Sequence, residues 1–181
     1  MDVRTFVSIP VPATEGVLRV SEDLRRTAGV RVTPADKLHL TLCFIGDVDE
    51  KLIPEVGRCV TASVRGMGPG ELTLKDVGVF PDIRKPRVVW IGVSTDMPLK
   101  DVADRLGAEL DAKNISRDGK PFKPHVTVGR IPDNADLRTV TDRYRGVELG
   151  SFGCSSVKIM KSELLPSGAK HTVLNSVVLE H

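Results

Sequence analysis

The chain has 181 residues, of which 40% are hydrophobic, and its 26 basic and 24 acidic residues leave a formal net charge of +2. This length and apolar content suffice for one domain with its own core, and the near balance of charge excludes a protein that coats nucleic acid nonspecifically. Any anionic ligand must therefore be held by a local group of basic residues.

The three cysteines, Cys43, Cys59 and Cys154, are odd in number and show no Cys-x-x-Cys spacing. This pattern favours reduced thiols over a disulfide framework. The N-terminus lacks the basic and apolar regions of a signal peptide, and no stretch approaches the length of about eighteen apolar residues that a membrane span needs. We expect a cytoplasmic monomer that does not engage a membrane.

In chain order, the first half of the sequence predicts three strands and two helices. The strands are expected at residues 5–11, 38–45 and 71–80, where apolar residues run together or alternate. A helix should follow Thr14, a candidate N-cap, and end before Gly29. The second helix should begin at Asp47 or Asp49 and carry its apolar stripe to Val64.

The second half repeats this order of elements. We predict a strand at residues 88–93, a helix that begins near Pro98, and a strand around residues 125–128. A weaker helix at residues 133–145 should be followed by one strand from about residue 149 to 164 and a last strand at residues 171–179.

One four-residue pattern occurs twice, at residues 39–42 (His-Leu-Thr-Leu) and 125–128 (His-Val-Thr-Val). The chain contains four histidines and twelve threonines, so chance predicts fewer than one His-x-Thr match. Because side chains alternate between the two faces of a strand, each histidine should share a face with its threonine, about 7 Å away. The opposite face of the first strand should bury its apolar residues, Phe44 included.

The two motifs lie 86 positions apart, and the same offset maps the other elements of the first half onto those of the second. We infer a strand-helix-strand-helix-strand unit that occurs twice, at approximately residues 3–82 and 87–165 of a single domain spanning residues 1–181. The predicted fold is α+β and bilobal, with the two units packed about a pseudo-two-fold axis. Both histidines, His39 and His125, should then face one groove.

Two imidazoles at one site suit a reaction in which one proton is removed and another is delivered, because histidine titrates near neutrality. Phosphodiester cleavage is such a reaction, since the attacking oxygen loses a proton while the leaving oxygen gains one. Thr41 and Thr127 would donate hydroxyl hydrogen bonds to the nonbridging oxygens. Threonine also favours strands, which explains part of its presence without any function. The scheme needs no metal ion and no cofactor.

The sequence resembles the 2H phosphoesterase superfamily and, within it, the bacterial and archaeal RNA 2′,3′-cyclic phosphodiesterases, also called 2′-5′ RNA ligases. The resemblance covers essentially the whole chain and rests on the doubled His-x-Thr pattern and on residues 6–10, 38–46, 78–81, 86–90, 121–130 and 165–169. It implies a bilobal α+β fold with antiparallel sheets around a central groove. It also implies an RNA-processing hydrolase that opens a 2′,3′-cyclic phosphate end, such as that of a tRNA fragment, to a 2′-phosphomonoester without a metal ion.

The resemblance also implies roles for individual residues. His39 would be the proton donor and His125 the proton acceptor, an order that the residues by themselves leave open. Arg130 matches the arginine that follows the family's second motif and is a candidate phosphate ligand. Because strict alternation would turn Arg130 away from His125, this role requires a bulge or a strand end near Gly129. Without it, Arg130 is a surface or packing residue.

Three alternatives compete with this interpretation. A zinc site formed by His39, His125 and Cys43 has suitable residue types, but the ligand spacings are wide and no carboxylate flanks either motif. ATP-independent 2′-5′ RNA ligation, the reverse reaction, would use the same two histidines. A non-catalytic RNA or nucleotide-binding module would retain the groove, although the intact His and Thr of both motifs argue against it.

We also consider the other histidine, aromatic and basic residues that lie near the predicted groove in the sequence. Family members commonly have a tyrosine where His171 stands, and we expect His171 to be an exposed strand residue. Phe44, Phe80 and Phe122 are expected to pack in the core rather than to stack on a base. Six basic residues are candidates to steer an RNA backbone, although solvated loop charge explains each of them more simply: Arg84, Lys85, Arg87, Lys120, Lys123 and Lys161.

Overall fold

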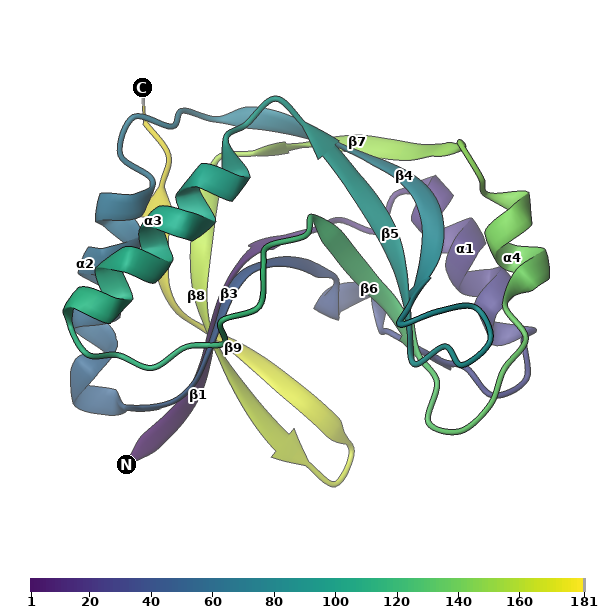
Figure 1. Cartoon of the computed structure of the whole chain (residues 1–181), viewed down its shortest axis with the longest axis horizontal. Coiled ribbons are helices and arrows are strands. Elements are labelled where there is room, and N and C mark those ends of the chain that lie inside the picture. The colour runs from purple at the N-terminus through teal and green to yellow at the C-terminus, as the bar shows by residue number, and fades with distance from the viewer. Residues whose placement is uncertain (181) are drawn as a thin grey trace.

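The computed structural model describes residues 1–180, which form an antiparallel nine-stranded sheet with helices at both ends (Figure 1). The strands are β1 (Asp2–Pro10), β2 (Arg31–Val32), β3 (His39–Asp49), β4 (Gly70–Phe80), β5 (Val88–Thr95), β6 (His125–Arg130), β7 (Glu148–Cys154), β8 (Ser156–Leu165) and β9 (Gly168–Val178). The helices are α1 (Glu15–Arg25), α2 (Ile53–Ser63), α3 (Leu99–Ala112) and α4 (Arg138–Arg143), with short 3-10 helices η1 (Ala35–Lys37) and η2 (Glu50–Leu52). The predicted α+β class is confirmed. Within this part of the chain, no helix has both the length and the apolar character that crossing a membrane requires.

The sheet consists of two lobes that meet at its centre. The strand order is β7-β4-β5-β6-β3-β1-β8-β9, with β2 paired to β6. Neighbouring strands inside each lobe share long registers, whereas β6 and β3 are joined at one residue pair of the described chain, Leu40 with Val126. The lobes are therefore β7-β4-β5-β6 and β3-β1-β8-β9, and the predicted bilobal arrangement with antiparallel sheets is confirmed.

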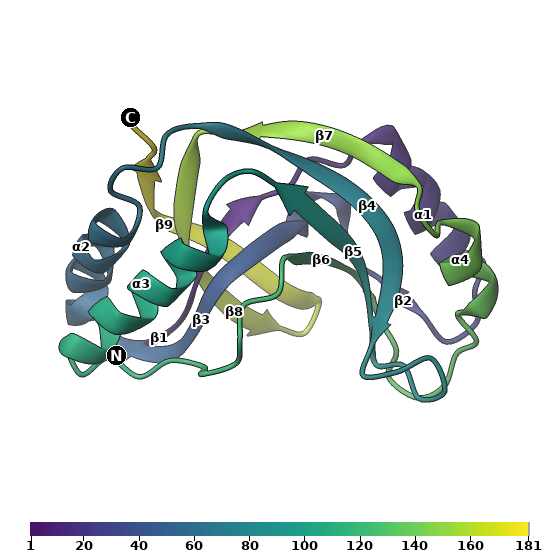
Figure 2. The same cartoon turned by 45° about the horizontal axis from the view of Figure 1, so that its top comes forward.

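The helices exchange between the lobes. α1 follows β1 in the chain but packs on β2, β6 and β7 of the other lobe, beside α4. α3 follows β5 but packs on α2 and β3. Figures 1 and 2 both show α2 with α3 at one end of the molecule and α1 with α4 at the other. Because each half of the chain supplies parts of both lobes, neither lobe can form from one half alone.

The duplication is visible in where the strands begin. β1 and β5 begin at residues 2 and 88, β3 and β6 at residues 39 and 125, and β4 and β8 at residues 70 and 156, which is 86 positions apart in each case. α1 and α3, and α2 and α4, fall between these strands in the same order. The duplicated unit of the predicted fold is therefore present, while the single-domain organisation and the repeat bounds 3–82 and 87–165 stay predictions.

Several predicted elements are wrong in extent. The strand expected at residues 38–45 continues to Asp49, so the second helix begins after Asp49, first as η2 and then as α2. The strand expected from about residue 149 to 164 is two strands, because the chain pairs with β4 up to Cys154 and with β1 and β9 from Ser156, and so crosses between the lobes. The helix expected at residues 133–145 begins only at Arg138. The residues before Arg138 pass close to Gly29 without regular structure, where a side chain at Gly29 would strike the carbonyl of Asn134.

α1 is fastened to β7 by contacts of its first turn. The Thr14 hydroxyl caps the helix by accepting a hydrogen bond from the Val17 N–H (3.2 Å), and it donates to the Leu149 carbonyl. Gly16 lies directly against the backbone of Leu149, where an added Cβ would stand 2.5 Å from the Leu149 Cα. The predicted N-cap is confirmed, and the absence of a side chain at Gly16 allows the close approach of helix and strand.

Replacing Gly16 with alanine should therefore lower the free energy of unfolding by about 1–3 kcal/mol, because the obstructing atoms are backbone and cannot move aside cheaply. Denaturant unfolding followed by circular dichroism measures the change. Gly153→Ala is the matched control in β7, since a Cβ there meets no atom within 4 Å. Equal stability of the two variants would contradict this account of the α1–β7 contact.

Candidate active site

The two His-x-Thr motifs lie side by side on the two strands that join the lobes. Leu40 of β3 pairs with Val126 of β6 in antiparallel sense, and both side chains are completely buried. The residues on either side of this pair therefore point to the opposite face of the sheet. The antiparallel sense places His39 on the side of Thr127 and Thr41 on the side of His125.

Each imidazole is held by the same backbone contact. The Nδ1 atom of His39 lies 2.8 Å from the Lys37 carbonyl oxygen, and that of His125 lies 2.7 Å from the Lys123 carbonyl oxygen. A carbonyl can only accept a hydrogen bond, so Nδ1 carries the proton in each neutral ring and Nε2 holds the lone pair. Both histidines thus keep Nε2 for proton transfer.

Four of the five predicted site residues line one groove of about 790 Å³, namely Thr41, His125, Thr127 and Arg130. His39 lies beside this wall. Its ring packs on Phe6 with ring centres 4.9 Å apart, and it meets the ring of His171 edge-on at 5.5 Å.

A bulge in β6 turns Arg130 toward the groove. In the register with β5, Trp90 pairs with Thr127 and Val89 with Gly129, so that Val128 is the extra residue. An extra residue reverses the alternation beyond it, which brings Arg130 onto the face of Thr127. This is the irregularity that the proposed phosphate-binding role of Arg130 required.

A second bulge, in β3, places Phe44 on a different face of the sheet from the one predicted. Val7 of β1 pairs with Cys43 and Ser8 with Thr41, which leaves Leu42 extra. Phe44 therefore lies on the groove side of the sheet and lines the groove, not on the buried face where strict alternation placed it. Phe80 and Phe122 line the groove as well. The expectation of core packing is wrong for Phe80 and is confirmed for Phe122, which packs against the core while lining the groove.

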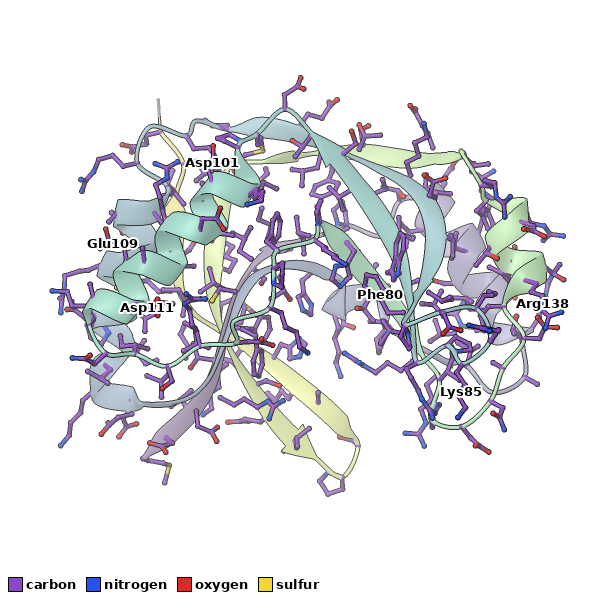
Figure 3. All side chains as sticks on the ribbon, viewed as in Figure 1. Phe80, Lys85, Asp101, Glu109, Asp111 and Arg138 are labelled. Atoms are coloured by element: carbon purple, nitrogen blue, oxygen red, sulfur yellow. The ribbon has the colours of Figure 1, made fainter. Side chains whose placement is uncertain are left out.

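The ring of His125 lies among aromatic residues of its own lobe, β7-β4-β5-β6. Its ring meets Phe80 edge-on at 5.2 Å between ring centres, and Phe80 lies over Trp90 at 5.2 Å. The Trp90 ring lies directly over Gly78 in the neighbouring strand, where any side chain would collide with it. Figure 3 shows Phe80 at the end of β4, on the side facing the other lobe.

The expectation that His171 is an exposed strand residue is wrong. Its side chain is half-buried, and its ring lies edge-on to Phe6 at 5.1 Å as well as to His39. Burial, followed by the nearby His39, lowers the pKa of His171. His171 therefore shares the surroundings of His39, which the strand pattern of β9 could not indicate.

Of the six candidate basic residues, Lys120 and Lys123 line the groove and the others do not. Arg84 and Lys161 form ion pairs with nearby carboxylates, and Arg87 donates to backbone carbonyls. The groove also contains Arg117, which the sequence did not single out because its loop carries no periodic pattern.

The zinc alternative has no support in the geometry. Among residues 1–180, no three His, Cys, Asp or Glu side chains gather in a group that could hold a metal ion. Burial raises the pKa of the Cys43 thiol to about 11, which disfavours the thiolate that a metal would need. His39, His125 and Cys43 therefore do not form the suggested site.

The electrostatic surroundings of His39 lower its pKa. Burial is the largest cause, the hydrogen bond to the Lys37 carbonyl opposes it, and the positive charges of Arg130 and His125 lower the pKa further. His39 is therefore neutral near pH 7 in the free protein. An anion bound beside Arg130 would offset these charges and favour the protonated ring.

Comparison with known proteins places the chain in a family. The sequence pattern of the 2′-5′ RNA ligase superfamily matches residues 12–164, so the chain belongs to that superfamily, and the resemblance noted in the sequence is confirmed. Among curated relatives, the RNA 2′,3′-cyclic phosphodiesterase of Methanothermobacter thermautotrophicus is 34% identical over 178 residues, covering 95% of this chain and 96% of the relative. The protein of the same name from Aquifex aeolicus is 31% identical over 186 residues, covering 98% and 97%.

Solved structures show the same fold. The crystal structure of the protein TT0787 from Thermus thermophilus superimposes with a TM-score of 0.83 at 28% identity, covering 98% of this chain and all of that one. Escherichia coli LigT complexed with 3′-AMP has a TM-score of 0.72 at 22% identity over the whole of both chains. At this low sequence identity, the comparison with LigT shows only that the two proteins share a fold.

Arg130→Gln should raise the pKa of His39, because it removes one of the positive charges that lower it. An NMR titration of the histidine ring protons measures the pKa directly. Arg87→Gln is the control, since it removes a cation whose guanidinium is bound to the carbonyls of Pro132 and Asp133, and it should leave the pKa of His39 unchanged. An unchanged pKa in Arg130→Gln would show that the two groups are not coupled.

Proposed function

We propose that this protein hydrolyses the 2′,3′-cyclic phosphate at an RNA end to a 2′-phosphomonoester. The observation that carries the proposal is the pair of imidazoles, one from each lobe, each fixed through Nδ1 to a backbone carbonyl and each accompanied by a threonine. The names of the relatives support it, since proteins more than 30% identical over nearly the whole chain are called RNA 2′,3′-cyclic phosphodiesterases.

In the proposed reaction His125 acts as the base and His39 as the acid. A water molecule attacks the phosphorus while His125 Nε2 takes one of its protons, and the bond between phosphorus and the 3′ oxygen breaks. His39, protonated at Nε2 once the anionic substrate is bound beside Arg130, gives this proton to that oxygen, which leaves a 3′ hydroxyl and a 2′-phosphomonoester. His125 gains one proton and His39 loses one, so the total number of protons on the enzyme is unchanged. Proton exchange with solvent then returns both rings to their starting states.

The remaining site residues are proposed to bind the phosphate. Arg130 lines the groove on the face of Thr127 and can offer a fork of N–H donors to the phosphate oxygens. Thr41 and Thr127 would donate from the same wall. These donors would stabilise the negative charge on the phosphate oxygens in the transition state, which is the role that a metal ion plays in other enzymes. We therefore propose a reaction that needs neither a metal ion nor a cofactor.

The same site would catalyse ATP-independent 2′-5′ RNA ligation, in which the 5′ hydroxyl of a second RNA attacks the phosphorus in place of water and the 3′ oxygen leaves as before. The family to which the chain belongs is named for this activity. An RNA with a free 5′ hydroxyl, supplied together with the cyclic phosphate end, tests this second function. Joined product in excess of hydrolysed product would make ligation the main activity.

We further propose that the natural substrate is an RNA fragment such as a cleaved tRNA, and that the protein acts as a cytoplasmic monomer. All three cysteines are free thiols, which favours a reducing compartment. The local basic residues of the groove suit an RNA end better than a long duplex. Light scattering on the purified protein measures the oligomeric state.

Incubation with an oligonucleotide that ends in a 2′,3′-cyclic phosphate, with EDTA present, should yield a 2′-phosphate end. His39→Ala and His125→Ala should each lower kcat by about 10²- to 10⁴-fold, because each removes one proton-transfer group. Chromatography of the products distinguishes 2′- from 3′-phosphate ends, and circular dichroism confirms that the variants are folded.

A requirement for added metal would overturn the mechanism, and full activity of either folded histidine variant would overturn the assignment. Binding of the oligonucleotide without any product would identify a binding module instead.

Thr127→Val should lower kcat by roughly 10²-fold, because valine keeps the shape of threonine and removes the hydroxyl donor. Thr127→Ser retains the donor and should keep most of the activity. Thr73→Val is the matched control, since Thr73 bonds to Ser151 on the exposed surface of β4. The same steady-state assay serves all three, and equal rates for Thr127→Val and the wild type would remove Thr127 from the site.

A further inference from the structure

A second arginine besides Arg130 lines the groove, on the loop that follows α3. The Nε atom of Arg117 donates to the Gly107 carbonyl (3.2 Å) and to Asp111 Oδ1 (3.1 Å), and Nη2 donates to Asp111 Oδ2 (2.9 Å). The side chain is 28% exposed. These bonds fix the plane of the guanidinium, and none of the hydrogen bonds within residues 1–180 uses Nη1.

The helix beneath Arg117 is shaped to receive it. Gly107 lies in the interior of α3, where glycine costs about 1 kcal/mol relative to alanine. A Cβ at this position would stand 2.8 Å from the Arg117 Cζ. Glycine at position 107 therefore lowers the stability of the helix, but it leaves room for the guanidinium of Arg117. Figure 3 shows Asp111, the carboxylate partner of Arg117, near the end of α3.

Arg117 belongs to the same groove as the proposed active site but lies farther along β3. The groove of about 790 Å³ is lined by Thr41 and His125 and also by Phe44 and Arg117. The N–H of the next residue, Asp118, donates to the Phe44 carbonyl (2.8 Å), which ties the loop to β3 at that point. Thr41 and Phe44 pair with Ser8 and Phe6, so they are separated by the rise of two strand residues, about 7 Å. This is comparable with the spacing of successive phosphates in an extended RNA strand.

The carboxylates near Arg117 are each paired. Asp111 is bound to Arg117, Asp104 to Lys100 (2.9 Å) and Asp118 to Lys120 (3.8 Å). Lys123 adds a positive charge to the groove, with its ammonium 5.8 Å from the centre of the Phe80 ring. Anion binding here must therefore come from the position of the fixed guanidinium rather than from a large excess of positive charge.

We propose that Arg117 binds the phosphodiester that precedes the terminal nucleotide, so that the groove recognises an oligonucleotide end rather than a free nucleotide. This inference rests on the proposed function of the same site. The half-exposed rings of Phe44 and Phe122 line the same groove and offer flat surfaces to the terminal nucleoside.

The test compares kcat/KM for a nucleoside 2′,3′-cyclic phosphate with kcat/KM for a dinucleotide and a trinucleotide that end in the same cyclic phosphate. The wild type should prefer the longer substrates by about tenfold or more, as a charge-assisted contact predicts. Arg117→Gln should remove most of this preference. In Arg117→Gln, the affinity for the trinucleotide should also depend less steeply on salt concentration, by the amount expected for the loss of about one phosphate contact.

Gly107→Ala provides a second variant that keeps every charge. Its Cβ displaces the guanidinium, while alanine favours the helix, so the protein should remain folded and still lose the preference for longer substrates. Arg105→Gln is the matched control on the same helix, because Arg105 bonds to the carbonyls of Asp101 and Arg65 outside the groove. It should keep the wild-type preference.

Equal loss of activity on all three substrates in Arg117→Gln, or an undiminished preference in both Arg117→Gln and Gly107→Ala, would overturn the inference. So would a wild type that does not discriminate by length. If the wild type hydrolyses none of the substrates, the proposed function fails. The affinity for a trinucleotide with a 2′-phosphate end, compared between the wild type and Arg117→Gln, then still decides whether this binding site exists.

Discussion

The contact between β3 and β6 is the constraint on which the rest of the structure depends. Leu40 and Val126 pair across it with both side chains fully buried. On either side of this pair the two strands turn a histidine and a threonine to the opposite face. Since β3 belongs to one lobe and β6 to the other, the site exists only while the lobes are joined at this point.

The imidazoles are oriented by the backbone rather than by other side chains. In both motifs Nδ1 bonds to the carbonyl two residues earlier, which selects the tautomer with a free Nε2 in each ring. The two rings nevertheless differ in their surroundings. His39 is packed between Phe6 and His171, and its pKa is lowered by burial and by nearby cations, whereas His125 lies at the edge of Phe80 in the open groove. The two histidines therefore have different surroundings, although they occupy equivalent positions in the two motifs.

The exchange of helices between lobes explains how the groove is closed at its far end. α3 belongs to the second half of the chain but packs over β3, in the lobe β3-β1-β8-β9. It brings Gly107 and Asp111 to the side of Phe44, where they seat Arg117. The duplication that places two histidines at one site therefore also adds a wall that neither half of the chain would build alone.

The sequence by itself determined the duplicated unit, the two strands that carry His39 and His125, and the N-cap at Thr14, because these follow from local periodicity and from an offset of 86 that recurs along the chain. The tertiary structure decided where the strands bulge and which distant segments meet, because neither depends on the periodicity of the sequence. The bulges at Leu42 and Val128 appear only in the register between neighbouring strands, and they bring Phe44 and Arg130 to the groove. The places of His171 beside His39 and of Arg117 on α3 depend on contacts between segments distant in the chain, which no spacing in the sequence records.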